Sequence, residues 1–568
     1  MKVRTGARTF VPALLGTLAL LAALVPMQAT QARSSQASSH PCVVGTGAGD
    51  TTFVRNFNPF GAAMDFTIGG IYEPLYVIVT AGGGHEYPWL ATAYKWTDSN
   101  HTLLLTIRDG VKWSDGQPFT AKDVLFTLTA GTINAALDQG VGYAPRATSN
   151  IASINIVGSN QVALHFKKVD TTVLSNIVSG IKVIPQHIWA SIKNPTTFTN
   201  PNPVGTGPYT EVQKFSGQDY ILGKNPHYWQ PGKPVVSCLE RSFASGNDAA
   251  MISMVHGDVD WTGNFVPNVQ KVYVARDPQH FHYFYATPNT PAGLFFNDLK
   301  YPYTLVDFRK ALSMAINRQQ VSTIGEYGYA PPADATGLAF QFPGWVNHAL
   351  DSQSKMLTTY NKDAAKALLT KIGFTNKGGQ LYDPKGNKVS IVLNVINGWT
   401  DWVLSMQIIE KNLKDIGIDA SVKLSPDYNS WSAQADKGLV PHLHWTYSGS
   451  TPYTYFNSTL GPSSFVPTGT PAGSTGNWAR FVDPAAAPLL ARFKSTADTA
   501  TQRQLANKLQ VLEIKDFPYI PLFIGPSWYT YSTKYFTGWP TQQDPYVNGQ
   551  MGAYPDRVVV LTRLVPAK

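Results

Sequence analysis

WLATAYKWTDSNHTLLLTIRDGVKWSDGQPFTAKDVLF, residues 89–126, contains the strongest structural signals in this chain of 568 residues. Leu103, Leu105 and Ile107 share one face of an alternating segment, which is the pattern of a β-strand with two different faces. Two Asp-Gly dipeptides follow, and each predicts a turn. The stretch therefore predicts a strand, two turns and the start of a helix.

The helix start has its own signals. Thr120 is a predicted N-cap, and Asp123 stands three residues later, where a variant capping box would place its acidic partner. Phe119 and Val124 occupy the two positions of a hydrophobic staple. These residues carry no chemistry, so we expect a rigid module that shapes a lobe.

Residues 90–127 resemble the segment that marks the extracellular solute-binding proteins of family 5, the binding components of ABC importers for dipeptides, oligopeptides, nickel complexes and some oligosaccharides. Other family-like segments are NPF at 58–60, YEPL at 72–75, VIPQHIW at 183–189, VGTGPY at 204–209, NPHYW at 225–229, GDVDW at 257–261 and DFRKALSMAINR at 307–318. The resemblance implies a two-lobed α/β periplasmic-binding-protein fold of the large class II type. It also implies a binding protein and not an enzyme.

The resemblance divides the chain into parts. It implies a first lobe over residues 41–294 with an extra subdomain at about 86–200. A second lobe would cover residues 295–534, and residues 535–568 would return to the first lobe. No internal repeat or low-complexity tract is visible.

Residues 1–32 have the composition of a secretory signal peptide. A basic start precedes an apolar run at residues 10–25, and small residues near position 32 offer a cleavage point. The run is too short to argue for a transmembrane protein. Residues 33–40 are polar and predict a disordered leader. We expect an exported protein, periplasmic or at the outer face of the cell membrane.

Cys42 and Cys238 are the two cysteines of the chain. An even pair in an exported protein indicates a disulfide, and both cysteines have strand-like flanks. Two buried thiols are the alternative. Cys42 follows His40-Pro41 rather than the Leu-Ala-Gly type of context in which relatives carry a lipid anchor, so the sequence favours a free protein.

The amino-acid composition argues against some classes of binding partner. The formal net charge is +9 without a run of lysine or arginine, which argues against a nucleic-acid partner. The chain has 14 Trp, 27 Tyr and 27 Phe. Such a content of rings is typical either of large cores or of a ligand cleft lined with aromatic side chains.

An enzyme and an adhesin are the competing classes. The sequence has no Gly-x-Ser-x-Gly, no His-Glu-x-x-His and no cysteine-rich metal set. A secreted glycosidase needs only two carboxylates and stays a remote alternative. An adhesin would be expected to show repeats.

Two histidine pairs bear on metal binding. His280 with His282, and His442 with His444, could each share a strand face, but two imidazoles make an incomplete site. We expect no metal and no other cofactor.

The choice between peptide and sugar depends on residues 444–456, HWTYSGSTPYTYF. Peptide-binding relatives hold the peptide ammonium with an Asp in the corresponding segment, and this segment contains no acid. A buried ammonium without a carboxylate would be poorly compensated, whereas a neutral ligand has no such need. The segment offers rings and hydroxyls instead, which suit an oligosaccharide. These are Trp445, Tyr447, Ser448, Ser450 and Tyr453. An oligopeptide is the alternative ligand.

Further candidate ligand residues come from the family-like segments. GSTPY at 449–453, GWTDW at 398–402 and GWPT at 538–541 look like the cello-oligosaccharide-binding branch of the family. The added candidates are Tyr72, Trp261, Asn297, Trp399, Asp401 and Trp402. Positions in the core are the alternative for these aromatic residues. The resemblance implies a monomer that closes around its ligand at a hinge and is then recognised by the ABC permease.

Overall fold

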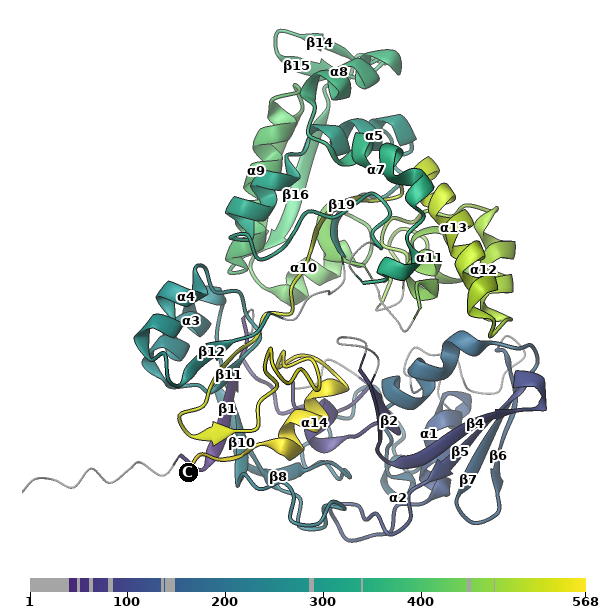
Figure 1. The fold of residues 1–568 in the computed structure, drawn as a ribbon, viewed down its shortest axis with the longest axis vertical. Helices are drawn as coiled ribbons and strands as arrows, with labels where there is room; N and C mark the ends of the chain where they lie inside the picture. The colour runs from purple at the N-terminus through teal and green to yellow at the C-terminus, as the bar shows by residue number, and fades with distance from the viewer. Residues whose placement is uncertain are drawn as a thin grey trace, which may run out of the picture. The chain divides into compact units, whose positions relative to one another are not determined.

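The elements expected from residues 89–126 are present in the computed structural model. β4 (Ala91–Thr97) and β5 (Thr102–Ile107) form an antiparallel pair, and α1 (Ala121–Ile133) follows (Figure 1). The N–H of Thr120 donates to Oδ2 of Asp123 at 2.9 Å, as in a capping box. The apolar face predicted for the strand is buried.

The structure describes residues 40–48, 52–60, 65–79, 85–133, 137, 149–285, 291–338, 341–446, 451–473 and 476–568. Residues 41–568 form one compact unit. The predicted signal peptide, and the leader up to residue 39, lie outside the described residues. Among the helices that are described, none is both long and apolar enough to cross a membrane.

Two large sheets make this a two-lobed α/β fold. The first lobe carries a seven-stranded sheet in the order β12-β20-β11-β1-β10-β9-β8. Its strands are β1 (Cys42–Thr46), β8 (Tyr209–Phe215), β9 (Asp219–Lys224), β10 (Cys238–Ser242), β11 (Trp261–Thr262), β12 (Phe281–Tyr283) and β20 (Thr530–Ser532). The same lobe holds a four-stranded sheet, β4-β5-β7-β6, completed by β6 (Ile151–Val157) and β7 (Gln161–Phe166).

The second lobe carries a five-stranded sheet in the order β17-β16-β18-β13-β19. Its strands are β13 (Pro291–Phe295), β16 (Ser390–Ile396), β17 (Asp419–Ser425), β18 (His442–Trp445) and β19 (Ile520–Ile524). β16 is parallel to both β17 and β18, so the carboxyl ends of these three strands lie at one edge of the sheet. The chain passes between the lobes after β12 and again after β19.

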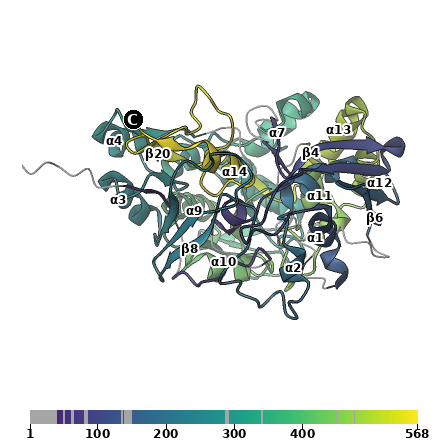
Figure 2. The same ribbon diagram turned by 90° about the horizontal axis from the view of Figure 1, so that it is seen from below.

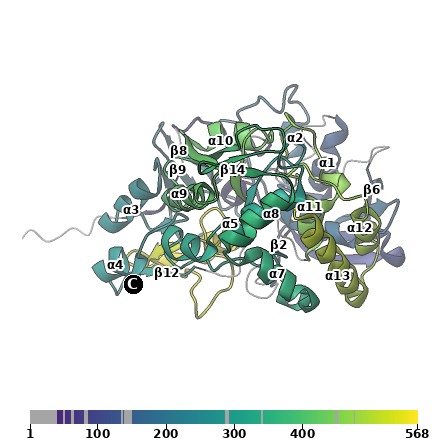
Figure 3. The ribbon, with the colours of Figure 1, turned by 90° about the horizontal axis from the view of Figure 1, so that it is seen from above.

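Helices cover the sheets and bury one main core in each lobe. The helices of the first lobe are α1, α2 (Gln186–Trp189), α3 (Asn247–His256), α4 (Val269–Val272) and α14 (Asp556–Arg563). Those of the second are α5 (Val306–Ala315), α6 (Arg318–Gln320), α7 (Asp351–Thr358), α8 (Lys362–Lys371), α9 (Thr400–Lys414), α10 (Tyr428–Ala435), α11 (Tyr453–Leu460), α12 (Ala486–Lys494) and α13 (Thr499–Asp516). α1 and α2 lie close together (Figure 2), and α5 packs beside α8 (Figure 3). Two-stranded pairs complete the fold: β2 (Tyr76–Ile78) with β3 (Glu86–Pro88), β14 (Thr375–Lys377) with β15 (Gln380–Tyr382), and β21 (Phe536–Thr537) with β22 (Val565–Pro566).

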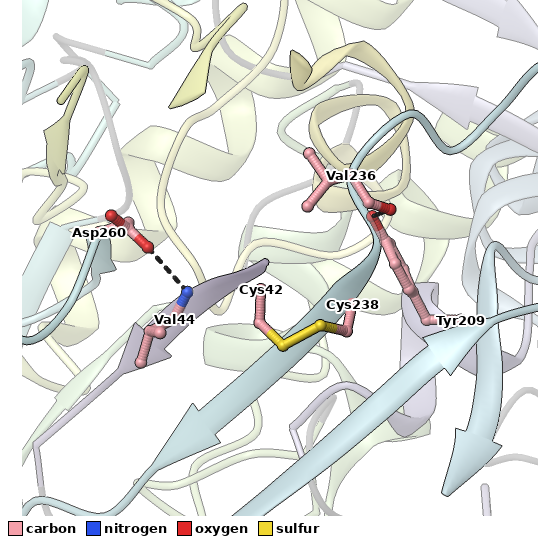
Figure 4. The surroundings of a disulfide bond; sticks show 6 residues. All are labelled: Cys42, Val44, Tyr209, Val236, Cys238 and Asp260. Carbon is pink, nitrogen blue, oxygen red and sulfur yellow. Dashed lines mark hydrogen bonds between the residues drawn. A yellow bond between two sulfur atoms is a disulfide. The ribbon is translucent and has the colours of Figure 1, made fainter. Parts of the chain in front are cut away.

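A disulfide joins Cys42 on β1 to Cys238 on β10 (Figure 4). The two residues are direct partners in this parallel strand pair, with their Cα atoms 4.3 Å apart. The strand predicted after Cys42 is present, but β10 begins at Cys238 itself, so residues 235–237, which the sequence predicted as strand, lie outside it. Next to the bond, Oδ2 of Asp260 accepts the N–H of Val44 at 2.9 Å.

Two expected boundaries are shifted. β13 of the second-lobe sheet begins at Pro291, whereas the sequence ended the first lobe at residue 294. β20 already belongs to the sheet of the first lobe at Thr530, whereas the sequence placed the return at residue 535. The chain leaves β19 at Ile524 and reaches the other sheet within a few residues. The connecting residues 525–529 are therefore a crossing segment between the lobes.

Candidate functional site

Three tryptophans of the second lobe meet at the carboxyl ends of β16 and β18. Trp399 and Trp402 come from the turn into α9 and its first turn, and Trp445 ends β18. The ring centroids are 5.1 Å apart for Trp399 and Trp402, 5.6 Å for Trp399 and Trp445, and 4.5 Å for Trp402 and Trp445. Trp402 is buried, whereas Trp399 and Trp445 are half-buried and keep part of their rings accessible. Loops at this edge of an α/β sheet are where ligand sites gather. We call these three residues the tryptophan cluster.

More rings extend the tryptophan cluster. Tyr428 lies 6.1 Å from Trp399 and is 43% exposed. Behind it, Trp431 stacks on His444 with centroids 5.7 Å apart, and His444 stacks on Trp478 at 3.9 Å. The accessible rings therefore rest on a second layer of buried rings.

The two histidine pairs differ from each other in burial and in their neighbours. His442 and His444 are buried, and burial lowers the pKa of His442 to about 3 and that of His444 to about 4. Just before β12, His280 pairs with Asp277 at 2.9 Å. Within the described ranges, no group of three or more His, Cys, Asp or Glu could hold a metal ion.

Asp401 occupies the first turn of α9, next to the tryptophan cluster. Its carboxylate accepts Nδ2 of Asn247, from the first lobe, at 3.0 Å, and the side chain of Trp528 favours its charged form and so lowers its pKa. Backbone N–H groups at the start of the helix stabilise the same carboxylate. Burial nevertheless outweighs these donors and raises the pKa of Asp401 to about 6.

A second buried carboxyl group lies close to Asp401. Oε1 of Glu326 accepts the hydroxyl of Ser405 at 3.0 Å, and its Oε2 has no hydrogen-bond partner. Burial raises the pKa of Glu326 well above its usual range, and the neighbouring Asp401 raises it further. Glu326 was not a candidate from the sequence, because nothing local distinguishes it from a surface glutamate.

A second group of rings surrounds the crossing segment. Trp528 packs edge-on against Phe265 at 5.2 Å and against Tyr285 at 5.0 Å, and it lies 6.1 Å from Tyr329. The hydroxyl of Tyr285 is buried without a hydrogen-bond partner. Sequence reasoning missed this group, although a Trp a few residues beyond the strand-like segment PYIPLF at 518–523 was an available signal.

The remaining candidates do not join the tryptophan cluster. Tyr72 and Trp261 are fully buried in the first-lobe core, where Tyr72 accepts Nδ2 of Asn200 and Trp261 donates to the carbonyl of Gly549. Asn297 is also buried.

The other candidate ligand residues lie away from the tryptophan cluster or outside the described residues. The Asn297 amide donates to the carbonyl of Gly438 and to Thr468. Tyr453 is half-buried and packs 5.8 Å from Phe493. Tyr447 and Ser450 lie outside the described residues, as does Ser448.

The chain matches the model of the bacterial extracellular solute-binding proteins, family 5 Middle, over residues 86–466. It belongs to this family. A family 5 protein of this kind is a solute-binding transport component of the extracellular or periplasmic type, and not an enzyme.

Similar proteins agree with this assignment. A probable ABC transporter-binding protein of Deinococcus radiodurans is 27% identical over 386 residues, which cover 60% of this chain and 61% of the relative. The nickel-binding periplasmic protein of Escherichia coli is 25% identical over 403 residues, covering 69% and 73% of the two chains. A solved structure from Thermotoga maritima, described as a periplasmic oligopeptide-binding protein with bound mannohexaose, has a TM-score of 0.82 and 26% identity, and covers 93% of this chain and 99% of its own.

Proposed function

We propose that this family 5 protein captures a neutral oligosaccharide between its lobes and delivers it to the permease of an ABC importer. The tryptophan cluster is the observation that carries the proposal. Its accessible rings provide flat apolar surfaces, onto which the apolar faces of sugar rings pack. Trp399 and Trp445 are the residues that we assign to this contact.

The charges near the tryptophan cluster favour a neutral ligand over a peptide. The carboxylate of Asp401 already accepts a hydrogen bond from Asn247, and Glu326 is buried close to it. Residues 444–456 add no acid. A peptide ammonium bound here would lose its hydration without gaining a free carboxylate, which is costly.

The comparisons support both the proposal and its competitor. The Thermotoga protein with bound mannohexaose shares the fold over nearly its whole length, which supports a sugar ligand. The same protein is described as oligopeptide-binding, and other relatives carry peptide- or nickel-binding names. An oligopeptide is therefore the second candidate ligand.

Titration calorimetry with mannohexaose, and in parallel with neutral tri- to pentaalanine peptides, tests the proposal. We expect heat of binding with the sugar and a higher melting temperature in its presence, because ligand binding to the folded state stabilises it by mass action. Binding of the peptides without any response to mannohexaose, or to cello- and xylo-oligosaccharides, would overturn the sugar assignment and leave the transport function in place.

We also propose how the chain is processed and divided. Residues 1–32 act as the signal peptide, and the mature protein works as a monomer. The first lobe ends before Pro291, where β13 of the second-lobe sheet begins, and its extra subdomain spans about 86–200, since the four-stranded sheet and α1 fall within that range. Limited proteolysis combined with N-terminal sequencing of the exported protein tests these boundaries.

A further inference from the structure

The backbones of the two lobes come into close contact at two glycines. Gly246 precedes α3 in the first lobe, and Gly398 precedes α9 in the second. A Cβ atom built on Gly246 would lie 2.9 Å from Cα of Gly398 and 3.0 Å from its carbonyl oxygen. Because real Cβ atoms do not come this close to backbone atoms, a residue larger than glycine at 246 is incompatible with this contact.

A hydrogen-bonded network surrounds the glycine contact. The N–H of Asn247 donates to the carbonyl of Gly398 at 2.9 Å. The side-chain amide of Asn247 donates to Asp401 at 3.0 Å and to the hydroxyl of Thr400 at 3.3 Å. Trp528, on the crossing segment, lowers the pKa of the same carboxylate by favouring its charged form. The Asp401 carboxylate of the second lobe thus binds Asn247 of the first lobe and interacts with the crossing segment.

We propose that Gly246, Asn247, Gly398, Asp401 and Trp528 form an interlobe junction that holds the lobes in their ligand-binding arrangement. Within it, Asp401 is a positioning residue: it fixes the start of α9, and with it Trp399 and Trp402, against the first lobe. The inference rests on the proposed function in that it assumes a ligand bound between the lobes. It changes the role of Asp401 from a ligand contact to a group that acts through its neighbours.

Gly246→Ala distinguishes a role in holding the two lobes together from a role in the stability of the fold. The backbone of Gly246 is extended, with φ near −178°, which alanine adopts without strain, so the added methyl group conflicts with the interlobe contact alone. Gly552→Ala is the matched control, since a Cβ there would meet no atom within 4 Å. Asn247→Ala removes the side-chain hydrogen bonds of Asn247 without adding a steric conflict. Asp401→Asn keeps one oxygen that can accept from Asn247 but loses the charged carboxylate, so it weakens the same network.

Two measurements test the junction. Spin labels on Lys193→Cys and Lys508→Cys, which are exposed positions in different lobes, report the interlobe distance by double electron–electron resonance. Calorimetry with mannohexaose reports the Kd. We expect Gly246→Ala, Asn247→Ala and Asp401→Asn to shift the distance distribution to longer values and to raise the Kd by about tenfold or more. Gly552→Ala should match the wild type in both.

Each outcome decides a separate question. Wild-type distances and a wild-type Kd in Gly246→Ala and Asn247→Ala would overturn the junction. A raised Kd in Asp401→Asn with unchanged distances would make Asp401 a direct ligand contact and would also overturn its positioning role. If mannohexaose does not bind the wild type, the proposed sugar function fails, and the ligand-free distance distributions of wild type and Gly246→Ala still decide whether the junction exists.

Discussion

Exposure separates the tryptophans of this protein into two kinds. Trp399 and Trp445 keep part of their rings accessible, whereas Trp261 is fully buried between Phe66 and Trp539. An accessible ring can exchange water for a ligand, but a buried ring contributes to the free energy of unfolding. Similar residues therefore predict opposite mutational effects.

Trp399→Ala should weaken mannohexaose binding and leave the fold intact. Loss of one stacking ring costs about 1–2 kcal/mol of binding free energy, or roughly a tenfold rise in Kd. Calorimetry measures this change. Trp345→Ala is the control, because Trp345 is a half-buried ring of the same lobe that packs on Phe493 outside the tryptophan cluster. Equal affinities of the two variants would remove Trp399 from the site.

Trp261→Ala should destabilise the first lobe by about 3–5 kcal/mol, the usual cost of removing a large buried ring. The variant also leaves the carbonyl of Gly549 without the indole N–H that it accepts at 2.7 Å. Denaturant unfolding followed by circular dichroism measures the loss. A variant that unfolds like the wild type but no longer binds mannohexaose would instead place Trp261 at the ligand.

Two buried carboxyl groups lie close together beside α9. Asp401 belongs to the first turn of this helix, and Glu326 accepts the hydroxyl of Ser405 from the same helix. Burial raises the pKa of both Glu326 and Asp401, and the charge of Asp401 raises the pKa of Glu326 further. The folded protein therefore binds more protons than the unfolded chain between the usual carboxyl pKa and the raised values. By linkage, the protons bound by these two carboxyl groups increase the free energy of unfolding at low pH. This stabilisation is lost as the pH rises through about 6 and above.

Glu326→Gln should reduce this pH dependence. The neutral amide can still accept the Ser405 hydroxyl but carries no charge to bury. We expect the variant to be at least as stable as the wild type at pH 8 and to lose less free energy of unfolding between pH 5 and pH 8. Urea unfolding at both pH values measures the difference. A pH dependence equal to that of the wild type would show that Glu326 does not titrate in this range.

On the scale of the whole molecule, the lobes also meet away from the interlobe junction. The hydroxyl of Thr171, in the first lobe, donates to the carbonyls of Lys494 and Thr496 in the second, at 3.3 and 3.1 Å. Nζ of Lys494 lies 3.4 Å from Asp170, whose side chain is largely buried. These contacts join the end of α12 to the first lobe and have no role in either core.

The double variant Thr171→Ala, Lys494→Ala should release ligand faster without losing stability. Weakening a contact that exists only while the lobes are together raises the dissociation rate, and one hydrogen bond plus one partly exposed ion pair supports an increase of about three- to tenfold. Stopped-flow fluorescence with mannohexaose measures this rate. Lys508→Ala, an exposed lysine on α13, is the control. An unchanged rate would mean that this contact does not restrain the bound state.

Much of the local structure could be predicted because its causes are local. Alternation marked β5, and the Thr120 and Asp123 pair marked the start of α1. Family-like segments added the two-lobed fold, and the grouping of Trp399 and Trp402 at a strand-to-helix turn was likewise readable from the chain.

Burial and long-range contact could not be predicted in this way. Trp261 and Trp399 look equally suited to a ligand in the sequence, and only the packing of β11 between neighbouring strands buries the former. Asn247 and Asp401 are 154 residues apart, and no periodicity or cap relates them. Propensity and capping act over a few residues, whereas the exposure of a ring and the partners of a carboxylate depend on which surfaces the folded lobes bring together.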